Sequence, residues 1–216
     1  FFGEDVAEAG GVFAATPGLR DKYGDDRVFD TPISELALSS AAFGSAVAGM
    51  RPIVEIMFAD FLFLAMDSLV NQSAKYWYLS NEQKSIPLVV RSAVGGGGGF
   101  GPIHSQVPIS WFLGVPGLKI VAPSTPNDAK RLLKAAIRDE NPVLFFEHKT
   151  LYSTAENREE ITGVETLGKG RILREGSDVT LVSCMRGVAD CLGAAQLLSE
   201  IGISAEVLDL RSLRPL

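Results

Sequence analysis

The chain has 216 residues, of which 46% are hydrophobic and 21% charged, so it can bury a core as one large domain or two modest ones. Its net charge is −6 and it has no basic run or basic stripe with interleaved aromatic residues, which argues against nucleic acid as a partner. No apolar stretch reaches the roughly 18 to 20 residues that span a bilayer, and the first residues carry acids where a signal peptide carries bases, so we expect an intracellular protein without membrane contact.

The predicted elements begin with FFGED, which has the pattern of a strand end, and from residue 27 short β-rich runs alternate with helical patterns. This alternation is typical of a parallel sheet with helices on its faces. Residues 35–50 are nearly all small or apolar, so we expect a helix buried on most sides and capped by Ser34. The most clearly marked helix is 125–142, with Pro126 in its first turn. The predicted strands are 27–30, 52–56, 87–93, 118–122 and 142–147.

The last third of the chain has a different organisation. Residues 148–168 have no sustained period and are interpreted as a linker. A second unit then follows, predicted as two strands around a Gly-Ser-Asp turn, a helix ended by Gly202 and a further strand, which is the start of an α/β domain that we expect to be incomplete. Cys184 and Cys191 lie seven apart on what is predicted to be this one helix, too far apart to share a helix face closely, so we expect no disulfide or zinc site and a reducing compartment.

Five consecutive glycines, 95–99, follow a predicted strand and precede His104, one of two histidines in the chain. A phosphate loop is disfavoured, because no Lys-Ser or Lys-Thr follows at the required spacing and Pro102 and Pro108 interrupt the helix that would be needed. One interpretation is a flexible surface loop, which costs backbone entropy on ordering. The other is a ligand site, since open sheets bind ligands at the carboxyl ends of parallel strands. His104 is then its candidate catalytic residue.

Glu35 is a carboxylate at the start of a predicted helix that is otherwise uncharged through residue 50. An acid in the first turn complements the helix dipole, which is a purely structural interpretation. The functional interpretation is that a carboxyl group held among apolar side chains has its charged form disfavoured and can share a proton with a ligand.

Seven segments of the chain carry a resemblance to a known family: GEDVAEAGGVF (3–13), GLRDKYGDDRVFDTPISE (18–35), AGMRPIVEIMFADF (48–61), DSLVNQSAKY (67–76), HSQ (104–106), PGLKIVAPSTPNDAKRLLKAAIRDENPVLFFE (116–147) and LDLRSLRPL (208–216). They cover essentially the whole chain in order and spacing. On these segments the chain resembles the beta subunits of thiamine-diphosphate-dependent 2-oxo acid dehydrogenases, the family of the pyruvate, branched-chain 2-oxo acid and acetoin enzymes. The resemblance implies an α/β fold with a mainly parallel sheet and helices on both faces. It also implies a pyrimidine-binding domain in residues 1–147, the linker 148–168, and in 169–216 the beginning of a transketolase-like carboxyl-terminal α/β domain.

The resemblance implies roles for four residues. Glu35, in TPISE, matches the glutamate that hydrogen-bonds the aminopyrimidine ring of thiamine diphosphate and helps to activate the cofactor. Met57 and Phe61 match positions that pack around this ring, although without the resemblance both are ordinary core residues. His104, in HSQ, matches an active-site histidine that orients substrate or transfers a proton during acyl transfer to a lipoyl arm, a task that suits a glycine-hinged loop. His148 falls where relatives often have proline and is interpreted as non-catalytic.

The segment AAIRDENP resembles a potassium-binding segment of some relatives. The helix carboxyl end, with its exposed carbonyl groups and one acid, accounts for the same residues, so both interpretations stay open. The implied ligands, mostly through backbone carbonyls, are Leu88, Ala136, Ile137, Asp139 and Asn141.

A Gly-Asp-Gly motif, which begins the magnesium and diphosphate site of thiamine enzymes, does not occur in the chain. The resemblance therefore implies that an alpha subunit holds the magnesium, in a heterotetramer of two alpha and two beta chains serving a lipoyl acyltransferase core. The implied substrate is a small 2-oxo acid or acetoin, in the bacterial cytoplasm or the mitochondrial matrix. Two alternatives stay open: a fragment of a single-chain transketolase-like or deoxyxylulose-phosphate-synthase-like enzyme, and a non-catalytic scaffold subunit.

Overall fold

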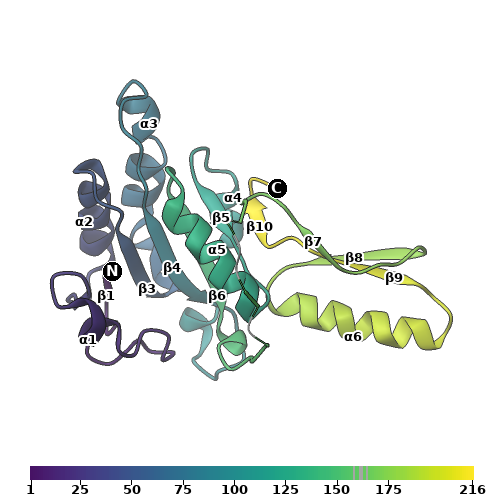
Figure 1. Cartoon of the computed structure of the whole chain (residues 1–216). Helices are drawn as coiled ribbons and strands as arrows, with labels where there is room; N and C mark the ends of the chain where they lie inside the picture. The colour runs from purple at the N-terminus through teal and green to yellow at the C-terminus, as the bar shows by residue number, and fades with distance from the viewer. Residues whose placement is uncertain (158, 161–162, 164) are drawn as a thin grey trace.

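The computed structural model describes residues 1–157, 159–160, 163 and 165–216, which form two β-sheets (Figure 1). The larger sheet has seven strands in the order β10-β5-β6-β4-β3-β1-β2. Neighbours among β1 to β6 pair in parallel, and β10 pairs antiparallel with β5 at one edge. The mainly parallel α/β fold expected from the sequence is confirmed. The strands are β1 Phe2–Gly3, β2 Phe29–Asp30, β3 Ile53–Phe58, β4 Val89–Val94, β5 Lys119–Val121, β6 Val143–His148 and β10 Ser212–Arg214.

The helices of this part cover both faces of the sheet. Strand residues alternate between the faces: Val90 packs in the cluster that contains α2, whereas its neighbour Val89 packs in the cluster that contains α5. Strands buried on both faces read as continuous apolar runs, which is why they were recognisable in the sequence. The helical segments are α1 Leu19–Tyr23, α2 Glu35–Val47, α3 Tyr76–Leu79, α4 Ile109–Leu113, α5 Pro126–Arg138, the π-helical segment Asp67–Ser73, and the 3₁₀ turns Ala59–Phe63, Pro102–His104 and Lys149–Leu151.

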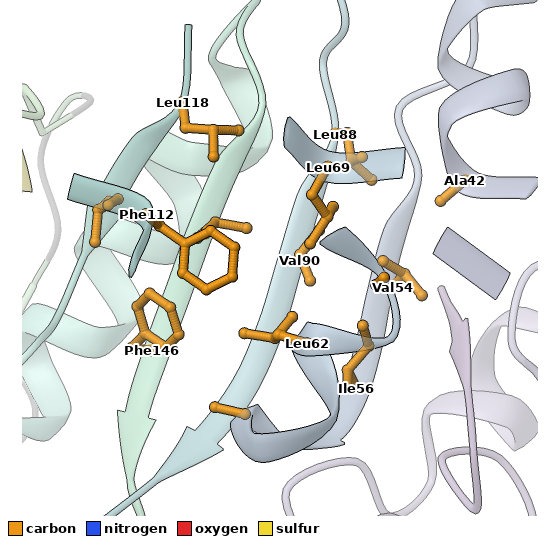
Figure 2. Close-up of a cluster of buried hydrophobic side chains, with 14 of the residues drawn as sticks. Ala42, Val54, Ile56, Leu62, Leu69, Leu88, Val90, Phe112, Leu118 and Phe146 are labelled. Atoms are coloured by element: carbon orange, nitrogen blue, oxygen red, sulfur yellow. The ribbon is translucent and has the colours of Figure 1, made fainter. Parts of the chain in front are cut away.

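The larger core lies on the α2 face. Figure 2 shows Leu62 and Leu69, which come from the segments after β3, lying over Val90, with the rings of Phe112 and Phe146 further along the sheet. All five side chains are at most 1% exposed. Because this core includes the segments that follow β3, it fixes the position of the turn Ala59–Phe63 at the end of that strand.

On the opposite face, α5 begins as its sequence predicts. The Thr125 hydroxyl accepts a hydrogen bond from the Asp128 amide at 3.2 Å, and Pro126 occupies the first turn. Leu132 and Ala136 then pack against Phe145 of β6. Residues 67–80, in contrast, form no single α-helix, because the backbone is π-helical at Asp67–Ser73 before α3 begins at Tyr76.

The smaller sheet has the order β7-β9-β8, with β7 Arg171–Arg174, β8 Val179–Ser183 and β9 Ala205–Asp209. Helix α6, Arg186–Glu200, packs on it through Ala195, and sheet and helix lie beside the larger sheet (Figure 1). The two strands predicted around the Gly-Ser-Asp turn are present but do not pair with each other, because β9 lies between them. The strand β10 then returns to the larger sheet, a connection that the sequence did not predict.

Helix α2 is not buried on most sides as expected, because only one side of it faces the sheet, and the Ser34 side chain makes no capping hydrogen bond. Two other expectations also differ from the structure. Cys184 does not belong to the same helix as Cys191, because α6 begins only at Arg186; both thiols are free, as expected. The interpretation of 148–168 as a linker falls partly on residues 158, 161, 162 and 164, which lie outside the described residues, and its first residues form the ordered turn Lys149–Leu151. None of the described helices is long and apolar enough to cross a membrane.

Candidate functional site

The candidate site lies at the carboxyl edge of four adjacent strands, β4, β3, β1 and β2. Glu4 directly follows β1, and Glu35 opens α2 after the short connection from β2. Phe61 lies in the turn that continues β3, and His104 ends the turn that closes the loop after β4. Because these strands are parallel neighbours, their carboxyl ends meet at one edge, which is where open α/β sheets bind ligands.

Glu35 is a buried carboxylate, 6% exposed, in the first turn of α2. Among the described residues, none donates a hydrogen bond to its carboxylate; only its backbone carbonyl is engaged, by Ser39. Its oxygens are not among the fully enclosed side-chain atoms that lack a partner, so they stay accessible at the start of α2. The two carboxylate oxygens therefore suit a ligand that brings its own N–H groups, and the positive end of α2 favours negative charge there.

Glu4 is a second buried carboxylate beside Glu35, and the sequence analysis did not single it out. It is 5% exposed, and its Oε1 accepts a hydrogen bond of 3.3 Å from the Ser34 amide at the start of α2. Burial raises the pKa of Glu4, and the negative charge of Glu35 raises it further. Two carboxylates in one buried site favour retention of a proton, which is the setting in which an acid can exchange a proton with a bound base.

The rings of Phe61 and His104 lie against each other. The imidazole of His104 stands edge-on to the ring of Phe61, with 5.2 Å between centroids, and to the ring of Phe58, at 4.7 Å. These aromatic contacts fix the plane of the imidazole. Met57 is half-buried and lies at the irregularity in the pairing of β3 with β4, one residue before Phe58.

The glycine run packs closely against the end of β6 and the turn that follows it. Gly95 has a φ of +91°, and an added Cβ would overlap the imidazole of His148. Gly97 has a φ of +104°, and its Cβ would approach the Thr150 Cγ2 to 2.7 Å. Both positions therefore require glycine for conformation and for space. For Gly96 and Gly99 an added Cβ would meet open space, so the run is only partly explained by packing.

Two hydrogen bonds anchor the far end of this loop. The Gly95 amide donates to the Gln106 carbonyl at 3.1 Å, which closes the loop at its base. Gln106 in turn donates through its Nε2 to Asp60 Oδ1 at 2.8 Å. Asp60 is buried, at 6% exposed, in the turn that carries Phe61. The two segments that present Phe61 and His104 are thus joined directly.

A buried ionic cluster lies on the α5 face of the larger sheet, on strands β3, β4 and β6. Arg91 of β4 donates two hydrogen bonds of 2.7 Å to Glu147 and one of 2.6 Å to Glu55. Burial alone would lower the pKa of Arg91, but the two carboxylates outweigh burial and raise it. Burial raises the pKa of Glu55, against the attraction of Arg91. Tyr152 donates to Glu147 at 2.5 Å, which links the cluster to the residues just after the turn Lys149–Leu151.

The residues that the resemblance assigns to potassium are brought together at the carboxyl end of α5, but several already have partners. The guanidinium of Arg51 donates to the carbonyls of Ile137 and Asp139, at 3.1 and 3.0 Å. The Asp139 carboxylate accepts from Lys119 and Asn141. The Leu88 and Ala136 carbonyls each accept one backbone amide. In the described part of the chain, no group of three or more His, Cys, Asp or Glu side chains could hold a metal ion.

Comparison with known proteins gives two domain matches. Residues 1–154 match the transketolase pyrimidine-binding domain, and residues 168–216 match the transketolase C-terminal domain. The chain also resembles a solved structure described as a split-gene transketolase, inactive beta4 tetramer, with a TM-score of 0.78 and 22% identity over 99% of this chain and 64% of that one. At that identity the likeness shows the fold.

Curated relatives are more similar in sequence. The 2-oxoisovalerate dehydrogenase subunit beta of Bacillus subtilis is 48% identical over 99% of this chain and 66% of its own length. The mitochondrial pyruvate dehydrogenase E1 component subunit beta-1 of Arabidopsis thaliana is 44% identical over 99% of this chain and 60% of its own length. The chain thus spans just under two thirds of the length of these relatives.

Proposed function

Because the chain belongs to the transketolase family, with a pyrimidine-binding domain and part of the C-terminal domain, we propose that it is a beta subunit of a 2-oxo acid dehydrogenase. The observation that carries this proposal is the buried carboxylate of Glu35, left without a hydrogen-bond donor at the carboxyl edge of the sheet. The rings of Phe61 and His104, which contact each other, lie in segments that leave the same edge of the sheet.

Glu35 fits the aminopyrimidine ring of thiamine diphosphate, because a buried carboxylate beside a second acid can share a proton with a ring nitrogen. When bound, this cofactor supplies an electron sink that makes decarboxylation of a 2-oxo acid accessible. Glu35 would hold the proton at the ring. Glu4 lies close enough for its charge and that of Glu35 to interact, so a second carboxyl group stands at this end of the site. Phe61 and Met57 would bound the ring with apolar surface.

His104 would act on the substrate side of the site. Its imidazole is half-buried and lies at a right angle to the rings of Phe58 and Phe61, which restrict its orientation without enclosing it. A histidine can exchange a proton near neutral pH, which suits reductive acylation of an incoming lipoyl disulfide: the disulfide would accept two electrons, one sulfur would take the acyl group, and the other would take a proton to become a thiol. We assign it to that step.

The partners and metals of the complete enzyme belong to the same proposal. An alpha subunit with a Gly-Asp-Gly motif would hold magnesium and the diphosphate, in a tetramer of two alpha and two beta chains that serves a lipoyl acyltransferase core. The substrate class is a small 2-oxo acid or acetoin, in the bacterial cytoplasm or the mitochondrial matrix. Potassium at α5 would have to share the Ile137 and Asp139 carbonyls with Arg51, so its test is whether potassium, but not sodium, raises the melting temperature of the enzyme.

Two alternatives remain open. A single-chain transketolase-like enzyme shares this fold. However, two relatives at 44% and 48% identity are named as beta subunits of 2-oxo acid dehydrogenases, whereas four solved transketolase structures that resemble the chain are 17–22% identical to it. A non-catalytic scaffold is disfavoured by the presence of both Glu35 and His104 at the carboxyl edge of the sheet.

The proposal is tested by Glu35→Gln in the enzyme assembled with its alpha subunit. The amide keeps the size of the side chain but cannot share a proton in the same way, so we expect the decarboxylation rate to fall by about 100-fold or more, with the assembly unchanged. Glu200→Gln, at the exposed end of α6, is the matched control and should retain the rate of the unaltered enzyme. Near-normal turnover by Glu35→Gln would refute the assignment.

A further inference from the structure

Lys149 is a buried lysine that no role described above explains. It is 7% exposed, in the turn Lys149–Leu151 directly after β6. Burying an ammonium group is costly unless the charge is paired or hydrogen-bonded, and lysine is among the residues that proteins bury least. Burial lowers the pKa of Lys149, and the carboxylate of Asp60 opposes that shift. The position of this lysine therefore calls for a specific partner.

The partner is the backbone of the candidate catalytic residue. The Lys149 ammonium donates a hydrogen bond to the carbonyl oxygen of His104. The same nitrogen lies 5.2 Å from the ring centroid of Phe58 and 5.0 Å from that of Phe100, both within reach of cation–π attraction. Phe58 is one of the two rings that hold the His104 imidazole edge-on. Lys149 thus holds both the main chain of His104 and a ring that orients its side chain.

The residues on either side of Lys149 contact the same loop. His148 lies against Gly95, and Thr150 lies against Gly97, in each case too closely for any residue but glycine. His148 is held in turn, because its Nδ1 accepts a hydrogen bond of 3.3 Å from the Thr150 amide. Residues 148–150, which we call the loop platform, therefore contact the start and the end of the segment from Gly95 to His104.

The chemistry of the loop explains why a platform is needed. Glycine pays more backbone entropy on ordering than any other residue, so a loop with five glycines in a row does not hold a histidine in one place by itself. Rate depends steeply on such placement, because a shift of about 1 Å can cost on the order of 100-fold. A hydrogen bond from a charged ammonium is stronger than one between neutral groups, and the bond from Lys149 is made to the backbone of His104, the residue that must be held in place.

We propose that Lys149 is the positioning residue that holds His104 of the glycine loop in its catalytic place. The inference rests on the role in acyl transfer proposed above for His104. It adds that the residues after β6, and not the loop sequence alone, determine where the imidazole stands. Lys149 itself need touch neither substrate nor cofactor.

The first test is a double-mutant cycle between Lys149→Met and His104→Ala in the enzyme assembled with its alpha subunit, with acyl transfer to a lipoyl domain as the assay. Methionine keeps the apolar stem but removes the ammonium. We expect Lys149→Met to lower kcat about 10- to 100-fold in the otherwise unaltered enzyme. In the His104→Ala variant, adding Lys149→Met should lower kcat by less than a further factor of two. Lys134→Met, at an exposed position on α5, is the matched control and should leave the rate unchanged.

A merely structural role gives a different result. If Lys149→Met lowers kcat by the same factor in both backgrounds, it acts on the fold and not through His104, and the proposal is wrong. It is equally wrong if Lys149→Met leaves kcat unchanged. Should Lys149→Met not fold, Lys149→Gln keeps a hydrogen-bond donor without the charge and enters the same cycle, with the same expected loss of additivity.

A second measurement needs no activity and separates this inference from the proposed function. Amide hydrogen exchange in residues 96–104 should become at least tenfold faster in Lys149→Met and stay unchanged in Lys134→Met. If the unaltered enzyme turns over no 2-oxo acid, the proposed function has failed, but faster exchange in Lys149→Met still supports the positioning role of Lys149. Unchanged exchange in Lys149→Met overturns that role, whether or not the enzyme is active.

Discussion

Replacing Arg91 by methionine should lower the free energy of unfolding, because Arg91 is the cation of the buried cluster with Glu55 and Glu147. The guanidinium is 8% exposed and makes three hydrogen bonds of 2.6–2.7 Å to two carboxylates. Methionine fills a similar volume but leaves Glu55 and Glu147 buried without a cation. Breaking a buried ion pair by removing one partner typically costs about 3–5 kcal/mol, and we expect a loss in that range at pH 8.

The sign of the pH dependence follows from Glu55. Burial already raises the pKa of this carboxyl, and Arg91 opposes the shift, so removing Arg91 raises it further. A carboxyl whose folded pKa lies above its unfolded value destabilises the fold as pH rises through that interval. The deficit of Arg91→Met should therefore shrink towards pH 5, by up to about 1.4 kcal/mol per pH unit for each proton taken up.

Urea unfolding of both proteins at pH 5 and pH 8 measures this directly. Arg186→Met removes an exposed guanidinium that pairs with Asp190, and as the matched control it should change the stability little at either pH. Adding Glu147→Gln to Arg91→Met should recover part of the loss. A deficit below about 1 kcal/mol at pH 8, or one that is the same at both values of pH, would refute the reasoning.

Other residues give further predictions. Burial raises the pKa of Asp209 to about 6, so ionisation of this carboxyl lowers the unfolding free energy as pH rises from about 4 to 7. Asp209→Asn should remove that loss, which is about 3 kcal/mol. Urea unfolding curves taken across this pH range measure it. Gly95→Ala adds a strained φ and a clash, so it should weaken docking of the glycine loop by about 2–4 kcal/mol in hydrogen exchange, whereas Gly96→Ala, which meets open space, should not. Thr125→Ala removes the cap of α5 and should lower the unfolding free energy by about 0.5–2 kcal/mol in urea; a change near zero would show that the cap is redundant.

The parts of the fold that were predictable are those with local signals. Strands buried on both faces are continuous apolar runs, and α5 is marked by a capping threonine and a first-turn proline. The return of β10 to the larger sheet was not predictable, because Ser212–Arg214 carries no signal for β5, with which it pairs 91 to 94 residues away in the sequence. The π-helical backbone of Asp67–Ser73 likewise has no counterpart in apolar periodicity.

The site was predictable only in part, for a similar reason. His104 and Glu35 stood out as a lone histidine after glycines and a lone acid on an apolar helix, and the structure places Phe61 against His104. Glu4 was missed because its significance lies in its proximity to Glu35, which depends on β1 being the neighbour of β2. Lys149 was missed because it begins a segment without periodicity; its contact with His104 spans 45 residues.

The most direct test of the proposed function is decarboxylation with separated and recombined subunits. The full-length chain is purified alone and with the alpha subunit that accompanies it, and each preparation is given thiamine diphosphate, magnesium, and pyruvate, branched-chain 2-oxo acids or acetoin. We predict no turnover by the chain alone and turnover of one of these substrates by the assembled enzyme. Turnover of a keto acid or a sugar phosphate by the chain alone would contradict the division of the cofactor site between two subunits.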